Sequence, residues 1–462
     1  MTAKSLIPPN VTKAVVLGVG DFGSGASAAL ALRALGLNVI VTDTRPASAF
    51  PEEQLSQLGA AGITLITGKN PDWLVDGNTL LVPAPSIPLS HKLVLKAGHV
   101  MSDLALLLAA AKGPVIGITG SNGKTTTTAW LHHILRQSAG GAILGGNIGI
   151  PAGNLISVAR RSPCPVVLEV SSWQAEYLSL AGLGPKVMVF TNFTPNHLDH
   201  YATLEDYREA KRGIIRHVPR DGTLVINCDD EMWTWPENFP GTILGFGELK
   251  LDSPTGIFFD KERVVLKDER GKVTKLGDTS AVPLPGKHNL YNLCAAIGAA
   301  MALGVSPKPA FERSLDFTGV EHRLEKVLTI KGVTFYDDSS STTPESTLIA
   351  VNAFDPPPVV IIGGHNKGMD VDLLAKGLKK ASGVVLIGEM GKVMQKMLGK
   401  TTPHVYLASG MADAVRKCLA FAIETGSHAV ALSPAFASFD MFKNYKHRGQ
   451  VFKEEVKKLA KL

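Results

Sequence analysis

One glycine-rich stretch of the chain has the residue types and the spacing of a phosphate-binding loop. Gly117-Ile-Thr-Gly-Ser-Asn-Gly-Lys-Thr125 follows an apolar segment expected to be a strand and opens a segment expected to be a helix. In such a loop backbone N–H groups surround phosphate oxygens, and the helix N-terminus adds partial positive charge. Lys124 would reach the β- and γ-phosphates, and Thr125 would hold Mg²⁺. Ile118 stands where the standard pattern has its first glycine, so a glycine turn without a ligand is the alternative.

A second glycine turn, Gly18-Val-Gly-Asp-Phe-Gly23, has the form GxGxxG. It lies between an expected strand, Ala14–Leu17, and an expected helix, Ala26–Leu35, and the next expected strand ends at Asp43. This order is typical of the βαβ unit that binds dinucleotides. The motif is weak evidence by itself, so the turn is compatible with NAD and with other nucleotides.

The elements that position both turns alternate between strand and helix, which predicts an α/β protein with parallel sheets covered by helices. We expect three domains: a Rossmann-like N-terminal domain (1–100), a P-loop ATPase central domain (101–318) and a Rossmann-like C-terminal domain (319–462). Residues 240–282 differ, because β-branched residues alternate around a turn there, and a small antiparallel sheet is expected. Other expected strands are Val166–Val170, Lys186–Phe190, Thr223–Ile226, Val333–Tyr336, Val359–Ile362, Val384–Ile387 and Ala429–Leu432, and expected helices include Asp103–Ala111, Asn289–Leu303 and Ala412–Thr425.

Composition narrows the class of protein. The formal charge of +6 on 462 residues is mild and scattered, which fits anionic small-molecule substrates and argues against nucleic acid as a partner. The four cysteines form no CxxC pair, and the longest apolar stretch is too short to span a bilayer. These features predict a cytoplasmic protein with no membrane partner. The cations of the last twenty residues, Arg448 and Lys453 among them, are expected on a solvated terminal helix.

The segment Thr119-Gly-Ser-Asn-Gly-Lys-Thr125 resembles the variant phosphate loop of the Mur ligases and folylpolyglutamate synthases. Further segments are similar to the Mur ligase family in the family's own order, and together they cover nearly the whole chain. They are Gly145–Gly149, Glu169–Gln174, Asn192–Tyr201, Gly286–Asn292, His322-Arg323, Asp338–Thr343, Gly363–Gly368 and Ser433–Asp440.

This resemblance implies an ATP-dependent ligase that activates a carboxylate as an acyl phosphate and lets an amine attack it. The glutamate-adding member implies transfer of D-glutamate to UDP-N-acetylmuramoyl-L-alanine, in peptidoglycan synthesis, by an enzyme expected to be a monomer. Implied catalytic residues are Lys124, His197, Lys211 and Arg323, and implied ATP-binding residues are Gly120, Ser121, Asn122, Gly123, Lys124, Thr125, Thr126, Asn289, Asn292, Arg323 and Asp338. Two Mg²⁺ ions are implied, with ligands Thr125, Glu169, His197 and Lys211.

Lys211 can serve as a metal ligand only after chemical modification. An ammonium cannot bind a cation, whereas carbon dioxide converts the amine to a carbamate with two oxygens suited to Mg²⁺. Thr203-Leu-Glu-Asp206 is a plausible capping box, so a helix over 207–216 would fix Lys211 relative to His197. For Asp199 and His200 hydrogen bonding is expected rather than metal coordination.

The resemblance also implies where the other two substrates bind. UDP-substrate residues would be Gly18, Gly20, Asp43, Arg45 and Asn147, and amino-acid residues would be Thr342, Lys367, Ser438, Phe439 and Tyr445. Ser340 stands where the family usually has a lysine, and Ala84-Pro-Ser86 replaces a Ser-Pro-Gly turn. L-Glutamate or another amino acid on a UDP-muramoyl substrate is therefore an alternative. A nucleotide-binding sensor or an NAD-dependent oxidoreductase is the alternative from another class.

Overall fold

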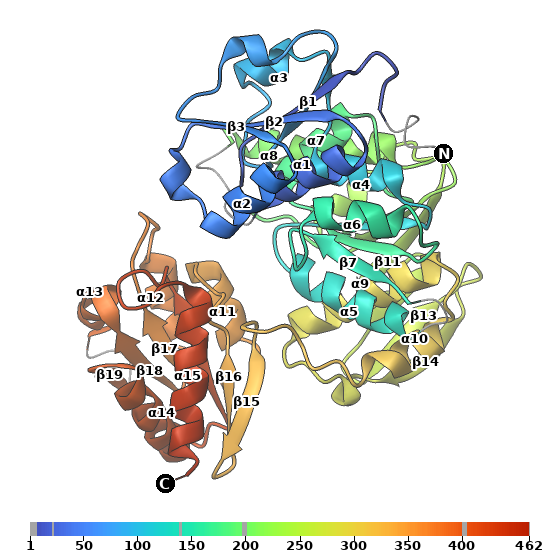
Figure 1. The fold of residues 1–462 in the computed structure, drawn as a ribbon. Helices are drawn as coiled ribbons and strands as arrows, with labels where there is room; N and C mark the ends of the chain where they lie inside the picture. Colours follow the sequence, from blue (N-terminus) through green and yellow to red (C-terminus); the bar gives the residue numbers. More distant parts are fainter. Residues whose placement is uncertain (1–6, 21–22, 138–140, 196–200, 400–403, 462) are drawn as a thin grey trace. The chain divides into compact units, whose positions relative to one another are not determined.

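The computed structural model describes residues 7–20, 23–137, 141–195, 201–399 and 404–461, and it contains three β-sheets (Figure 1). The chain divides into two compact units. The first comprises Met1–Ala281 and Tyr291–Ser314, and the second comprises Val282–Leu290 and Leu315–Leu462. Within the described part of the chain, no helix has the length and apolar character needed to cross a membrane.

The N-terminal sheet is parallel and has the order β3-β2-β1-β4-β5. In β1, Ala14 and Val16 pack on one face with helix α1, whereas Val15 and Leu17 pack on the opposite face. Both faces are covered, which explains why these strands are continuously apolar. The strands are β1 (Lys13–Leu17), β2 (Asn38–Asp43), β3 (Thr64–Thr67), β4 (Thr79–Pro83) and β5 (His99–Val100); the helices are α1 (Ser24–Ala34), α2 (Glu52–Ala60), α3 (Lys92–Lys96) and α4 (Asp103–Ala110).

The central sheet has nine strands in the order β14-β13-β12-β11-β10-β9-β6-β8-β7. Pairing is parallel from β7 to β12 and antiparallel between β12, β13 and β14. The antiparallel pairing expected over 240–282 is present, but the expectation of a small separate sheet is wrong. β12 adds to the edge of the parallel sheet, and β13 and β14 continue from it.

The bounds of the central elements follow the chain. The strands are β6 (Val115–Thr119), β7 (Ile143–Gly146), β8 (Val166–Glu169), β9 (Val187–Phe190), β10 (Thr223–Asn227), β11 (Thr242–Glu248), β12 (Gly256–Phe259), β13 (Arg263–Lys267) and β14 (Val273–Asp278). The helices are α5 (Lys124–Arg136), α6 (Ala152–Ala159), α7 (Ser172–Leu180), α8 (Leu204–Arg212), α9 (Lys287–Ala302) and α10 (Pro307–Ser314).

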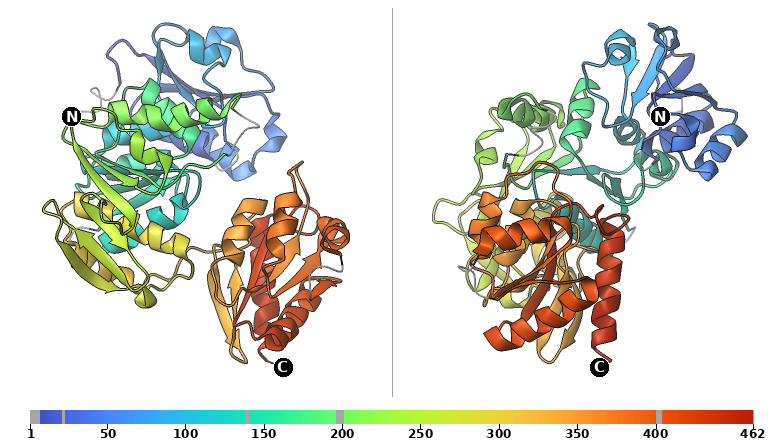
Figure 2. Two further views of the ribbon diagram at one scale, coloured as in Figure 1. Left: turned by 180° about the vertical axis from the view of Figure 1, so that it is seen from behind. Right: turned by 90° about the vertical axis from the view of Figure 1, so that its left-hand side faces the viewer.

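The C-terminal sheet has the order β15-β16-β20-β17-β18-β19, and β15 alone runs antiparallel to its neighbour. One core cluster joins its strands to α14 and α15, and another joins them to α11, α12 and α13. In Figure 2 the deep red helix α15 stands along one side of this sheet. The strands are β15 (Glu325–Ile330), β16 (Val333–Asp337), β17 (Val359–Gly363), β18 (Gly383–Ile387), β19 (Val405–Leu407) and β20 (Ala429–Ala435); the helices are α11 (Pro344–Val351), α12 (Asp372–Leu378), α13 (Gly388–Leu398), α14 (Met411–Thr425) and α15 (Tyr445–Leu459).

The terminal helix corrects one sequence-based expectation. Two of its cations, Arg448 and Lys453, are buried rather than solvated. Arg448 shares a face of α15 with the core residues Phe452 and Val456, because positions four residues apart lie above one another on a helix. This face packs on the sheet, so only the other faces of α15 are solvated.

Candidate active site

The phosphate loop lies between β6 and α5, as its sequence predicts. Gly120 and Gly123 have φ angles of 146° and 81°, which side-chain-bearing residues rarely adopt, and Gly123 caps helix α5. A Cβ atom on Gly120 would lie 1.9 Å from the Thr191 hydroxyl oxygen. Both glycines are therefore required by the backbone conformation. Gly120 is also required by the close approach of Thr191, which directly follows β9.

The segment after β9 holds this loop in place. The backbone N–H groups of Ser121 and Asn122 donate to the backbone and side-chain oxygens of Asn192, each at 2.8 Å. The Thr191 hydroxyl donates to the Asn122 carbonyl at 2.6 Å. The Ser121 hydroxyl lies 3.1 Å from the Tyr207 hydroxyl on α8. These contacts fix the loop directly before the positive N-terminal end of α5.

Two lysines converge on one carbonyl of the loop. Lys124 Nζ donates to the Gly120 carbonyl at 2.8 Å, and Lys211 Nζ donates to the same oxygen at 3.0 Å. Burial, and then the positive charge of Lys124, lowers the pKa of Lys211 well below its usual value. A lowered pKa leaves more of the amine neutral, and only a neutral amine adds to carbon dioxide.

Helix α8 places Lys211 beside the loop. The expected capping box is present, with Thr203 and Asp206 each bonding the other's backbone N–H, and the helix begins at Leu204. The α-helix ends at Arg212 and continues as a 3₁₀ helix over Gly213–His217.

Glu169, at the end of β8, has an environment that fits a cation ligand. One carboxylate oxygen accepts a hydrogen bond from the Asn147 side-chain amide at 2.9 Å. The other is buried and has no hydrogen-bond partner among the residues described. A buried carboxylate oxygen without a partner is costly, and Mg²⁺ is the partner that carboxylates commonly receive at such sites. Predicted ligand His197 lies outside the described residues, as do Asp199 and His200.

Asn289 and Asn292, the two asparagines of α9 expected to bind ATP, are buried. The Asn292 side-chain oxygen lies 3.3 Å from the Thr127 hydroxyl and 2.3 Å from where a Cβ on Gly123 would stand. Asn292 therefore abuts the first turn of α5. The Asn289 amide donates to the Pro285 carbonyl at 2.7 Å, which ties the start of α9 to the preceding segment.

The N-terminal glycine turn borders a polar pocket of about 280 Å³. Within it Asp43 accepts hydrogen bonds from the Val19 backbone N–H at 2.9 Å and from the Arg45 guanidinium at 3.0 Å. Burial opposes ionisation of Asp43, but the bonds from Arg45 and Val19 outweigh it and lower its pKa. The pocket is lined by Gly18, Gly20, Asp43, Thr44, Arg45, Asn70, Ala84, Ser86 and Ile87. Asn147, the fifth predicted UDP-substrate residue, does not line this pocket, and its side-chain amide donates to Glu169.

In the second unit, Asp338 follows β16 and is buried. It accepts hydrogen bonds from the Ser433 hydroxyl at 2.7 Å and the Leu324 backbone N–H at 3.2 Å. Burial raises its pKa to about 6. Arg323 is exposed on the adjacent turn.

Four of the five predicted amino-acid residues lie in loops at the carboxyl ends of β16, β17 and β20, and the fifth, Tyr445, is the first residue of α15. The Lys367 ammonium stands 5.5 Å from the centre of the Phe439 ring, which is 64% exposed. Ser438 is buried and Thr342 is half-buried. The Ser340 hydroxyl is buried with no partner in the described part of the chain.

Comparison with known proteins assigns the family. Residues 118–300 match the Mur ligase middle domain. A relative from Bacillus mycoides, named UDP-N-acetylmuramoylalanine--D-glutamate ligase, is 34% identical over 451 residues, covering 96% of this chain and 97% of the relative. A relative of the same name from Caldanaerobacter subterraneus is 33% identical over 449 residues, covering 95% and 97%. The chain belongs to the Mur ligase family.

Solved structures of Mur ligases share the fold. MurF ligase from Thermotoga maritima, in complex with ADP, matches with a TM-score of 0.59 and 16% identity, covering 98% of this chain and all of the other. UDP-N-acetylmuramate-alanine ligase MurC from Thermotoga maritima matches with a TM-score of 0.57 and 21% identity, covering 97% and 99%. The α/β class with three sheets, predicted from sequence, is confirmed.

One residue of this Mur ligase was missed by sequence reasoning. The Arg448 guanidinium donates to the Ser339 side-chain and backbone oxygens at 3.0 and 2.9 Å and to the Phe436 carbonyl at 2.9 Å. It thereby joins the loops after β16 and β20. The available signal was its spacing of four and eight residues from Phe452 and Val456, which indicates a core-facing position.

Proposed function

We propose that this Mur ligase adds D-glutamate to UDP-N-acetylmuramoyl-L-alanine at the cost of ATP hydrolysis to ADP and phosphate. The observation that carries the proposal is the convergence of Lys124 and Lys211 on the Gly120 carbonyl. Relatives that match nearly the full length of this chain are named for that activity. The proposed division of roles is UDP binding by 1–100, ATP binding by 101–318 and amino-acid binding by 319–462.

The reaction has two chemical steps. The substrate carboxylate attacks the γ-phosphorus of ATP, so an acyl phosphate forms and ADP leaves. The glutamate amine then attacks the acyl carbon, phosphate leaves with the electron pair of the C–O bond, and the amine loses a proton. The phosphoryl group in flight carries dispersed negative charge, so the protein acts mainly by positioning and neutralisation. Lys124 supplies one positive charge, and Arg323 is proposed to supply another.

Magnesium fits the residues present and would neutralise phosphate charge when bound. Thr125 and Glu169 would hold one ion, and the unpartnered Glu169 oxygen supports this role. His197 and carbamylated Lys211 would hold a second ion. Carbamylation also replaces a buried amine beside Lys124 with an anion, which favours the pairing with Lys124 and with a metal.

The pocket beside Gly18 and Gly20 is proposed to bind the UDP portion of the substrate. Arg45 offers the pocket a cation suited to phosphate, whereas Asp43 holds the turn and Arg45 together. Lys367 is proposed to pair with one carboxylate of the incoming glutamate, near Phe439, Ser438, Thr342 and Tyr445. The enzyme is proposed to work in the cytoplasm as a monomer.

Phosphate release from ATP, measured with UDP-N-acetylmuramoyl-L-alanine and a panel of D- and L-amino acids, tests the proposal. D-Glutamate should give the highest kcat/KM, because a site built for two carboxylates rejects analogues that leave polar groups unpaired. A higher value for L-glutamate would overturn the stereochemical assignment. Release only with another amino acid would establish a different Mur-type ligase, and no release with any of them would overturn ligase activity on this substrate.

A further inference from the structure

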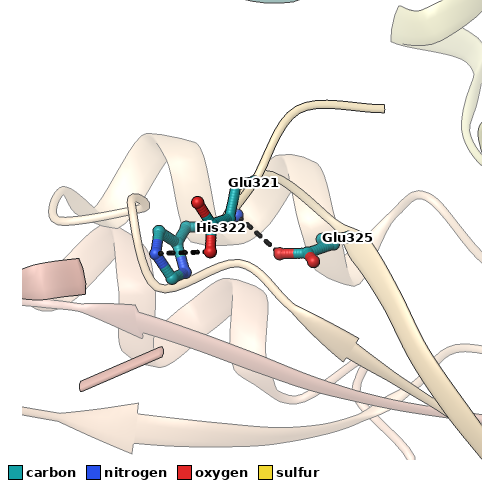
Figure 3. A group of neighbouring side chains, drawn as sticks. All are labelled: Glu321, His322 and Glu325. Atoms are coloured by element: carbon teal, nitrogen blue, oxygen red, sulfur yellow. Dashed lines mark hydrogen bonds and ion pairs between the residues drawn. The ribbon is translucent and has the colours of Figure 1, made fainter. Parts of the chain in front are cut away.

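A cluster of charged side chains lies at the turn that carries Arg323. None of its members is among the residues proposed to contact a ligand. Glu321 and His322, on the turn before β15, lie close to Glu325, the first residue of that strand (Figure 3). Lys453 on α15 reaches the same cluster. Its Nζ atom lies 2.9 Å from a Glu321 oxygen, 2.9 Å from a Glu325 oxygen and 3.8 Å from an oxygen of the fully buried Asp337.

Lys453 already supplies a cation to the three potential ligands, so the cluster does not need a metal ion. The Lys453 side chain is only 11% exposed, so its ammonium stays among the carboxylates. Burial would lower its pKa, but hydrogen bonds to Glu325 and Glu321 outweigh burial and raise it. His322 Nδ1 is engaged at 2.7 Å with Asp337. The cluster is an ion network that is buried at Asp337 and His322 and open to solvent at Glu321.

This network holds a turn whose backbone is unusual. His322 and Leu324, on either side of Arg323, have φ angles of 64° and 44°, a region that non-glycine residues rarely adopt. The turn persists because several bonds fix it. The His322 N–H donates to Glu325 at 2.9 Å, and the Leu324 N–H donates to Asp338 at 3.2 Å. The Ser340 N–H donates to the His322 carbonyl at 3.1 Å.

We propose that Lys453 is a positioning residue for Arg323, acting through Glu325, Asp337 and His322 rather than through any ligand. Without its charge, three carboxylates would face one another with no lysine between them. Their repulsion would weaken the bond from the His322 N–H to Glu325, which fixes one side of the turn. The carboxylates that no longer pair with Lys453 would also compete with phosphate for the Arg323 guanidinium. The step from Arg323 to catalysis rests on its proposed contact with the transferred phosphoryl group.

The positioning claim is tested first without catalysis, by amide hydrogen exchange of the full chain over residues 320–325. Lys453→Met should speed exchange in this segment by about tenfold, since interactions within one network commonly couple at this level. Lys453→Arg, which keeps the charge, should exchange like wild type. Lys458→Met is the matched control. Lys458 lies on the same helix, and its ion pair in the described part of the chain is with the nearby Glu455. Unchanged exchange in Lys453→Met would overturn the proposal.

The catalytic consequence is tested by a double-mutant cycle on kcat/KM for ATP. Lys453→Met should lower it about tenfold in the wild-type background and hardly at all in an Arg323→Lys background, because both changes impair the same group. Equal losses in the two backgrounds would mean a purely structural effect and would overturn the proposal. If Lys453→Met fails to fold, Glu321→Gln combined with it removes one surplus charge and allows the same measurements. A wild-type enzyme that releases no phosphate would instead defeat the proposed function, and the exchange result would still stand.

Discussion

Two glycine turns in the first unit end in the same conformation and have opposite internal charges. Each follows a strand, and each ends in a glycine that caps the next helix in the left-handed conformation, Gly23 before α1 and Gly123 before α5. In the N-terminal turn an N–H group, that of Val19, donates to the carboxylate of Asp43. In the central turn a carbonyl, that of Gly120, accepts from two lysines.

We expect this difference to suit each turn to the ligand proposed for it. An internal carboxylate at the first turn disfavours the dense negative charge of a triphosphate, and Arg45 leaves a single cation for a less charged group. At the second turn the charge of Lys124 suits a triphosphate, and a carbamate on Lys211 would suit its metal. The glycines set the shape of each turn, whereas side chains from distant elements, β2 and α8, set its charge. Substitutions at the first turn should therefore affect binding of the UDP substrate, and those at the second should affect turnover.

The largest effect is expected from Lys124→Ala. The substitution removes the positive charge facing the γ-phosphate, and kcat should fall by about two orders of magnitude or more, because preorganised charge of this kind contributes ~3 kcal/mol. The KM for the UDP substrate should stay near the wild-type value. Steady-state phosphate release measures both constants. A variant that keeps more than half of the wild-type kcat would rule out the assigned role of the central turn.

Lys211→Ala should lower kcat by about a hundredfold if the residue supplies a metal-binding carbamate. Small carboxylic acids such as acetate or formate should restore part of the activity, since they can occupy the vacant ligand position. The same acids should not restore Lys124→Ala, where a cation is missing, so the two lysines of the central turn can be told apart. Lack of any rescue would count against the carbamate, and mass spectrometry under carbon dioxide trapping checks it directly.

Arg45→Met should raise the KM for the UDP substrate by about tenfold and leave kcat within a factor of two, because a charge-assisted contact to phosphate is lost from binding alone. The KM for ATP should not change. Lys96→Met is a suitable control, because Lys96, the last residue of α3, donates to the Asp72 carbonyl outside the pocket. If Arg45→Met lowered kcat by as large a factor as it raises the KM, the distinction between the two turns would be wrong.

Sequence reasoning succeeded where the signal was local. The glycine–lysine loop, the Thr203–Asp206 capping box and the alternation of elements all depend on residues a few positions apart. It failed where partners are distant. Arg448 contacts Ser339 from 109 positions away, and Asn147 contacts Glu169 from 22 positions away on the neighbouring strand. No local pattern encodes such pairs, because they arise only when the sheet order is known. The meeting of Lys124 and Lys211 at one carbonyl belongs to the same class.

The smallest expected effects come from two tyrosines, one for each turn. Tyr207 is paired through its hydroxyl with Ser121 of the central turn at 3.1 Å, and Tyr177 on α7 donates to the Ile87 carbonyl, at the pocket of the N-terminal turn, at 2.8 Å. Replacing either by Phe removes one hydrogen bond and keeps the ring. Because a single such bond contributes about 1 kcal/mol, we expect changes of roughly threefold to fivefold.

The two tyrosine substitutions should change different kinetic constants. In Tyr207→Phe the Ser121 hydroxyl still donates to the Thr194 carbonyl at 2.9 Å and accepts from the Thr194 N–H at 2.9 Å, so the loop keeps its shape. The Lys211 Nζ atom also keeps its contact with the ring, whose centre lies 4.7 Å away. The loss should therefore appear as a modest fall in kcat. In Tyr177→Phe the Ile87 carbonyl loses the bond from the tyrosine hydroxyl, so the pocket loosens and the KM for the UDP substrate should rise while kcat is retained. If the two variants change the same constant, the turns do not act separately, and the contrast in charge between them would then concern folding rather than ligand choice.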